Sequence, residues 1–170
     1  KDVVVLDKTV LAEKIRVDSI ISNDTLNYIT GRFDPTQDSL FTEIPIKIAS
    51  RTGMFLRIEA LAAFEKMSAA ALKEGIHLQI ISATRNFDSQ KTIWENKWTG
   101  KTLVEDGKNL SLMPWSDQNK ALKILEYSSM PSTSRHHWGT DIDINSLSNA
   151  FFEQGVGKKL MTALEDIAHE

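Results

Sequence analysis

Residues 134–143 read Ser-Arg-His-His-Trp-Gly-Thr-Asp-Ile-Asp, the densest group of chemically useful side chains in the chain. They place an imidazole at His136 and a carboxylate at Asp143, with a turn-forming glycine, Gly139, between them. Neutral imidazole and ionised carboxylate both bind first-row metals, and this mixed donor set suits a catalytic zinc ion that keeps one position open for water. The first hypothesis is therefore a metal-dependent hydrolase.

The composition excludes several other kinds of protein. The chain has 170 residues, 41% of them hydrophobic and 25% charged, which suffices for one well-packed domain. Its formal charge of -3 gives no electrostatic footprint for nucleic acid and no polybasic patch for a membrane surface. Because there is no cysteine, thiolate zinc sites, disulfides and cysteine nucleophiles are excluded. Any metal must use His, Asp or Glu.

The beginning of the chain suggests processing. No apolar run approaches the length of a transmembrane helix, so no membrane-spanning segment is predicted. The sequence starts at Lys1 without an initiator methionine. We expect that a preceding segment was removed, by processing or by the choice of fragment.

Hydrophobic periodicity predicts an α+β domain. Apolar residues recur at helical spacing from Met54 to Lys73, and Gly75 follows where a helix would be capped. The short β-branched run from Ile76 to Ile81 predicts a buried strand. Two more helices are predicted over 87–98 and 117–127, the second with Asp117 as its N-cap.

Sequence patterns also predict structure near both ends of the chain. A strand from Thr140 to Ile144 and an amphipathic helix from Val156 to His169 are predicted after the histidine motif. Residues 1–50 are interpreted as an irregular lead-in of unknown role. Within it, Tyr28 to Phe33 and Leu40 to Ile48 are candidate edge strands, since Pro45 argues against a central strand.

A second group of chemical side chains follows the predicted strand 76–81. The chain there reads Ser82-Ala83-Thr84-Arg85-Asn86-Phe87-Asp88-Ser89-Gln90. An arginine at a junction between strand and helix can point its planar fork into a cleft, where it binds carboxylates or stabilises oxyanions. The alternative for a lone arginine is a solvated or structural ion pair.

Taken together, the two segments resemble one known family. Ser-x-x-Arg-x-x-x-x-Gln after a buried strand, followed downstream by Ser-x-His-x-x-Gly-x-x-x-Asp, is similar to the zinc D-alanyl-D-alanine carboxypeptidases of the VanY type. The resemblance covers about Met54 to Ile144. It implies an α+β fold with helices packed on a small antiparallel sheet, similar to the hedgehog and D-Ala-D-Ala peptidase fold, and a catalytic domain over 51–170.

The resemblance also implies roles for individual residues. His136 and Asp143 fall on the first two zinc ligands of the family, and Arg85 falls on the arginine that recognises or polarises the substrate. Gln90 and Ser134 match flanking positions and are expected to bind substrate. The implied substrate is a peptidoglycan stem peptide, the implied cofactor is Zn²⁺, and the implied location is extracytoplasmic, in the periplasm or at the cell surface.

The sequence departs from the family pattern in two places. Relatives normally carry a catalytic glutamate and a second histidine ligand on a further strand, and no such segment follows Asp143. The remaining histidine, His169, is expected to lie in the last helix and not to be a ligand, so the chain is interpreted as lacking the final ligand segment. Asp141 stands where many relatives have alanine, and it could brace a ligand or simply be tolerated.

Several other residues have structural alternatives. His137 is expected to have a supporting or solvent role and to be expendable, and His77 is expected to be structural within the buried strand. Trp94 and Trp98 share a helix face and are assigned to core packing. For Trp138, a cleft-lining role and a packing role stay open, while Asp88 fits a helix N-terminus.

Three functions follow from the sequence. The first is a zinc carboxypeptidase that removes D-alanine from stem peptides, cutting either a D,D or an L,D bond. The second is an endopeptidase of the same superfamily. The third is a cell-wall-binding module with a degenerate site. Arg85 favours the first, because a free terminal carboxylate is a natural partner for a guanidinium.

Overall fold

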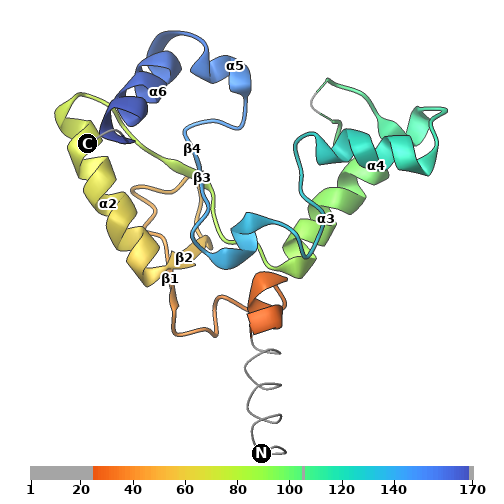
Figure 1. Cartoon of the computed structure of the whole chain (residues 1–170), viewed down its shortest axis with the longest axis horizontal. Coiled ribbons are helices and arrows are strands. Elements are labelled where there is room, and N and C mark those ends of the chain that lie inside the picture. Colours follow the sequence, from red (N-terminus) through yellow and green to blue (C-terminus); the bar gives the residue numbers. More distant parts are fainter. Residues whose placement is uncertain (1–24, 105, 169–170) are drawn as a thin grey trace, which may run out of the picture.

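The computed structural model describes residues 25–104 and 106–168, with side chains described as far as residue 164 (Figure 1). These residues form helices and two small antiparallel sheets, as the α+β prediction requires. Figure 1 shows α2 and α6 on one side of the β3 and β4 strands and α3 and α4 on the other side. The predicted fold class is confirmed.

The first sheet pairs β1 (Phe41–Glu43) with β2 (Phe55–Arg57), and α2 (Ile58–Lys73) follows β2 directly. The helix predicted from Met54 therefore begins four residues later. The backbone of residues 55–57 pairs with β1 instead, and Leu56 is 1% exposed in the core. Gly75 follows α2 with a φ of 73°, a left-handed conformation that glycine adopts without steric cost, as predicted.

The second sheet pairs β3 (Ile80–Ser82) with β4 (Asp143–Ile144) in antiparallel register. Both strands are shorter than the predicted runs 76–81 and 140–144. The register shifts between Ile80 and Ser82, which interrupts the ladder, and residues 76–79 lie outside it. This small sheet brings the end of β3 next to the segment that follows the histidine motif.

Two helices form a separate lobe. α3 (Phe87–Trp98) has the predicted bounds, and its N-cap Asn86 accepts a hydrogen bond from the Ser89 amide at 2.9 Å. After a 3-10 turn, η1 (Leu110–Leu112), α4 (Asp117–Leu125) begins one residue after its cap. That cap is the hydroxyl of Ser116, so the prediction of Asp117 as N-cap is wrong by one residue.

The described chain ends in α5 (Asn149–Phe152) and α6 (Gly155–Ala168), which confirms the predicted last helix over most of its length. His169 lies outside the described residues. Leu160 of α6 is 1% exposed and joins the main core, to which β2, α2 and β3 also contribute. A smaller core lies in the other lobe, where Val104, Leu110 and Ile124 pack with tryptophans of α3.

The described part of the lead-in packs on the rest of the domain. Residues 25–29 are helical and residues 30–33 continue in turns and bends, so the edge strand expected from Tyr28 to Phe33 is wrong. The segment from Leu40 to Ile48 does contain a strand, β1. Ile44 and Ala49 are each 2% exposed in the main core, so this part of the lead-in stabilises the fold.

Among the described residues, no helix has both the length and the apolar composition needed to cross a membrane.

Candidate active site

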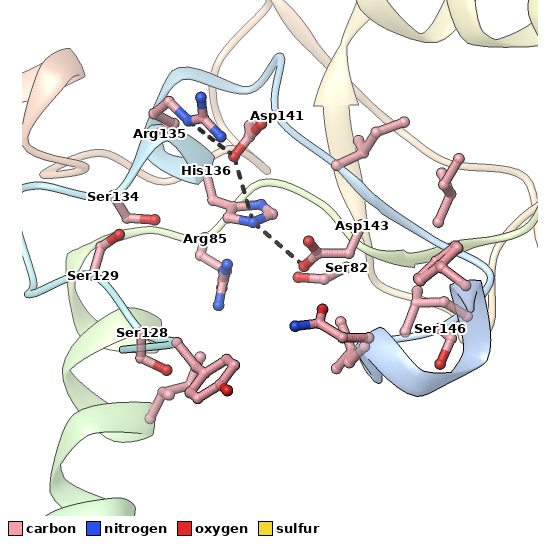
Figure 2. A pocket seen from close by; sticks show the side chains of 18 of the residues that line it. Ser82, Arg85, Ser128, Ser129, Ser134, Arg135, His136, Asp141, Asp143 and Ser146 are labelled. Atoms are coloured by element: carbon pink, nitrogen blue, oxygen red, sulfur yellow. Dashed lines mark ion pairs between the residues drawn. The ribbon is translucent and has the colours of Figure 1, made fainter. Parts of the chain in front are cut away.

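A cavity of about 870 Å³ lies between the two lobes, and residues of both sequence motifs line it (Figure 2). One wall comes from the end of β3 and from the histidine motif, and it carries Arg85, His136 and Asp143. The opposite wall carries Ser128 and Ser129, which follow α4. The two motifs predicted from sequence therefore meet in one cavity.

His136 is held by its backbone-facing nitrogen. Its ring is buried, 7% exposed, and Nδ1 lies 2.9 Å from the carbonyl oxygen of Ala83. Because a carbonyl only accepts hydrogen bonds, Nδ1 must carry the proton and donate it. In the neutral ring the lone pair then lies on Nε2, which is the arrangement of histidine metal ligands.

Asp143 lies beside that free nitrogen. Its Oδ2 is 3.4 Å from His136 Nε2. Hydrogen bonding to His136 lowers the pKa of the Asp143 carboxyl, the nearby charge of Arg85 and the hydroxyl of Ser82 add to this, and partial burial opposes it. Asp143 is therefore an anion beside His136 Nε2, an arrangement that suits a shared proton or a metal cation between the two groups.

The donor spacing fits a metal ion. Two ligands at about 2.0 Å from a tetrahedral zinc ion lie about 3.3 Å apart, close to the 3.4 Å between His136 Nε2 and Asp143 Oδ2. Within residues 25–104 and 106–168, no group of three His, Cys, Asp or Glu side chains is placed to hold a metal. The described residues thus supply two donors of a site that needs at least three protein ligands.

Asp141 lies on another side of the same imidazole. Its Oδ2 is 3.6 Å from His136 Nε2 and 3.6 Å from Nε of Arg135 (Figure 2). Figure 2 shows the ring of His136 between the carboxylates of Asp141 and Asp143. The Asp141 carboxylate is therefore placed to support His136, and its charge offsets that of the largely exposed Arg135.

Arg85 reaches the cavity from the turn between β3 and α3. Its Nε is buried and has no hydrogen-bond partner among the described residues. Burial lowers the pKa of the guanidinium, whereas the charges of Asp143 and Asp141 raise it. The group stays charged, because arginine is not deprotonated in proteins. A partly buried cation that lines a cavity is suited to an anionic or carbonyl ligand.

The structure places the other two predicted site residues differently. Ser134 is 2% exposed and lines the cavity. Gln90 is 1% exposed and lies behind the wall, where its Nε2 donates to the carbonyl oxygen of Ser129 at 2.6 Å. Its contact is therefore with the wall of the cavity, and substrate binding by Gln90 stays a prediction.

The solvent role considered for His137 is wrong, because its side chain is 0% exposed. Nδ1 lies 2.5 Å from the Arg85 carbonyl oxygen, and Nε2 accepts the Ser132 amide at 3.2 Å. Both ring nitrogens are in use, as expected for a histidine that is not a ligand. Burial lowers the pKa of this imidazole.

The structure corrects the interpretation of His77 and argues against a cleft-lining role for Trp138. His77 is exposed and precedes β3, so it is not within a buried strand. Trp138 is 43% exposed and is not among the residues that line the cavity. Trp94 and Trp98 pack on the smaller core, as predicted. Asp88 lies in the first turn of α3, also as predicted.

The sequence reasoning did not identify Ser128 and Ser129. The indole nitrogen of Trp94 and the amide of Gln90 both donate to the Ser129 carbonyl oxygen, each at 2.6 Å. Lys97 donates to the Ser128 hydroxyl at 2.9 Å. The only signal in the sequence was the pair of serines shortly before the histidine motif.

Comparisons with known proteins identify the family of this chain. The family model described as VanY, D-alanyl-D-alanine carboxypeptidase, matches residues 53–170. An uncharacterized protein of Haemophilus influenzae is 37% identical over 78 residues, which are 45% of this chain and 53% of that protein. YodJ of Bacillus subtilis, provisionally named a carboxypeptidase, is 28% identical over 124 residues, 72% of this chain and 38% of YodJ. The matched regions thus span about half or less of these relatives.

Two solved structures, LdcB and VanYB, share the fold of this chain. The LdcB LD-carboxypeptidase is 26% identical with a TM-score of 0.52, over 75% of this chain and 54% of that chain. VanYB, solved with D-alanine-D-alanine, is 20% identical with a TM-score of 0.51, over 78% of this chain and 63% of that chain. A VanY D,D-pentapeptidase solved in complex with Zn(II) is 22% identical with a TM-score of 0.43, over 62% and 57%. Because the VanY family model matches more than half of its residues, the chain belongs to the VanY family of D-alanyl-D-alanine carboxypeptidases.

Proposed function

We propose that this chain is the catalytic domain of a zinc-dependent carboxypeptidase that hydrolyses D-alanine-containing stem peptides of peptidoglycan. One observation carries the proposal: His136 Nε2 and Asp143 Oδ2 lie 3.4 Å apart in a cavity that Arg85 also lines. A pair of metal donors beside a partly buried guanidinium suits hydrolysis of a bond close to a carboxylate.

The zinc site would use His136 and Asp143. The hydrogen bond from His136 Nδ1 to the Ala83 carbonyl fixes the ring orientation. A further histidine and a glutamate, which the family carries after the last helix, would complete the ligand set and supply the general base. When bound, zinc supplies an activated water and polarises the scissile carbonyl.

Arg85 would bind the substrate beside this site. Its guanidinium lies in the cavity (Figure 2), where it can bind an external acceptor, either the terminal carboxylate or the oxyanion that forms during attack. Serine hydroxyls line both walls, and those of Ser128 and Ser134 are available to peptide groups of the stem. The cavity therefore combines the charged Arg85 beside the metal donors with hydroxyl groups that can contact the peptide.

Peptidoglycan lies outside the cytoplasmic membrane, so the proposed substrate places this domain in the periplasm or at the cell surface. LdcB and VanYB, which share the fold, are named for peptidoglycan recognition and for a complex with D-alanine-D-alanine, respectively. These names support the substrate class but do not select the D,D or the L,D bond.

The test uses the full-length protein with zinc and a stem peptide that ends in D-Ala-D-Ala. We expect release of D-alanine from the free-carboxylate peptide, no release from the same peptide with an amidated terminus, and loss of the reaction with a chelator. A peptide ending in L-Ala-L-Ala is the matched control.

The other outcomes would each indicate a different function. Equal cleavage of the amidated peptide, at an internal bond, would establish an endopeptidase. Binding of the peptide without cleavage, in protein that contains stoichiometric zinc, would establish a binding module and reject the proposal.

A further inference from the structure

His137 is buried beside the proposed metal ligand and has no part in the proposed chemistry. Its hydrogen bonds define its protonation without ambiguity. The Arg85 carbonyl oxygen only accepts, so Nδ1 of His137 carries the proton; the Ser132 amide only donates, so Nε2 carries the lone pair. The ring is a neutral connector between two backbone segments.

The bond to Arg85 completes a set of three hydrogen bonds between the two motifs. The Arg85 amide donates to the His136 carbonyl at 3.1 Å, and the Arg85 carbonyl accepts from His137 Nδ1 at 2.5 Å. The third bond joins His136 Nδ1 to the Ala83 carbonyl. The backbone amide and the backbone carbonyl of Arg85 are therefore both hydrogen-bonded to the dipeptide His136-His137. The arginine side chain extends from the Cα atom between these two groups.

The His137 ring is also confined by the lead-in. A Cβ atom added to Gly31 would overlap this ring, so the glycine backbone packs directly on it. Gly31 has a φ of 74°, and its carbonyl accepts the Phe87 amide at 2.8 Å. The ring consequently has little room to move away from Arg85.

We infer that His137 is a positioning residue: its Nδ1–H holds the Arg85 backbone so that the guanidinium enters the cavity beside His136 and Asp143. The consequence for catalysis rests on the proposed function, whereas the geometry does not. A displacement of about 1 Å in a substrate-binding group can lower a rate by about 100-fold, so loss of this bond should reduce kcat/KM measurably.

Two substitutions of His137 separate the effect of its hydrogen bond to Arg85 from the effect of its ring volume. His137→Asn keeps an N–H donor close to the position of Nδ1, whereas His137→Phe keeps a ring of similar size and removes both polar atoms. In the full-length protein we expect unchanged zinc content in both variants. We expect kcat/KM on the D-Ala-D-Ala peptide to fall by about 10-fold to 100-fold in His137→Phe and by about 3-fold or less in His137→Asn.

A double-mutant cycle tests whether His137 acts through Arg85. If it does, His137→Phe combined with Arg85→Ala should be no slower than Arg85→Ala alone. Additive losses would mean a general structural role and would overturn the inference, as would equal losses in the Asn and Phe variants.

Two measurements stand apart from activity. Long-range ¹H–¹⁵N spectra of the unmodified protein should show His137 protonated at Nδ1 and not at Nε2, and the opposite tautomer would reject the inference even if His137→Phe does not fold. Amide exchange at Arg85 should be slow in the unmodified protein and in His137→Asn and faster by about 10-fold in His137→Phe, a loss of about 1.4 kcal/mol of protection. If the unmodified protein cleaves no peptide, the proposed function fails and amide exchange still decides the inference.

Discussion

The two walls of the cavity are built in different ways. The wall with His136 and Asp143 rests on the main core, and side chains of the histidine motif hydrogen-bond the backbone of the arginine motif. The wall with Ser128 and Ser129 belongs to the α3 and α4 lobe, which has its own small core. The first wall holds Arg85, His136 and Asp143, and the second presents serines together with Lys97 of α3.

One face of α3 holds the second wall. Gln90, Trp94 and Lys97 are spaced four and three residues apart, so their side chains lie on the same side of the helix. All three donate hydrogen bonds to Ser128 or Ser129. This difference between the walls predicts that substitutions in the first wall abolish chemistry, whereas substitutions in the second wall weaken substrate binding.

The largest effect is expected at the metal donors. His136→Ala or Asp143→Ala in the full-length protein should abolish zinc retention, measured by metal analysis, because each removes one ligand from a small set. His77→Ala, at an exposed histidine, is the control and should keep its zinc. Stoichiometric zinc in both cavity variants would contradict the site.

The next effect concerns the stability of the second lobe. Ile124 is 0% exposed at the centre of the smaller core, and Ile124→Ala should lower the free energy of unfolding by about 2–5 kcal/mol. Leu122→Ala on the same helix is the exposed control and should change it little. Denaturant unfolding measures both. Zinc content should not change and KM should rise; loss of zinc in Ile124→Ala would show that the walls are not independent.

Arg85 belongs to the first wall but binds no metal. Arg85→Ala should leave zinc in place and lower transition-state stabilisation, measured as kcat/KM, by about 2–4 kcal/mol. Arg85→Lys keeps the charge without the planar fork and should recover part of this loss. Arg32→Ala, at an exposed arginine that does not line the cavity, is the control. An unchanged rate in Arg85→Ala would remove its role.

The smallest effect is expected at Gln90. Gln90→Met removes the hydrogen bond from Gln90 to the Ser129 carbonyl, which still accepts a bond from Trp94. The substitution also removes Oε1, a buried acceptor without a partner in the described structure. We expect a loss of stability of about 0.5–1.5 kcal/mol and a modest rise in KM. Lys91→Met on the exposed face is the matched control. A loss of kcat as large as that of Arg85→Ala would instead support direct substrate binding.

Patterns within a few residues were predicted well. The bounds of α3 follow from Asn86, whose side chain caps the helix, and from helical spacing up to Trp98. The turn at Gly139 is also local, because its φ of 72° is a left-handed conformation that glycine adopts without steric cost. β2 was not predicted, and the bounds of β3 and β4 were predicted poorly, because strand length depends on a partner far away in the sequence.

The sequence by itself determined the types of donor and their spacing: His136, Gly139 and Asp143 in one motif and Arg85 in another. Only the tertiary structure decided that the motifs meet, that His137 is a buried connector, and that Ser128 and Ser129 form the opposite wall. The physical reason is range. The bonds from His136 and His137 to the arginine motif span 53 and 52 residues, and such contacts form only when packing of the whole domain brings the segments together.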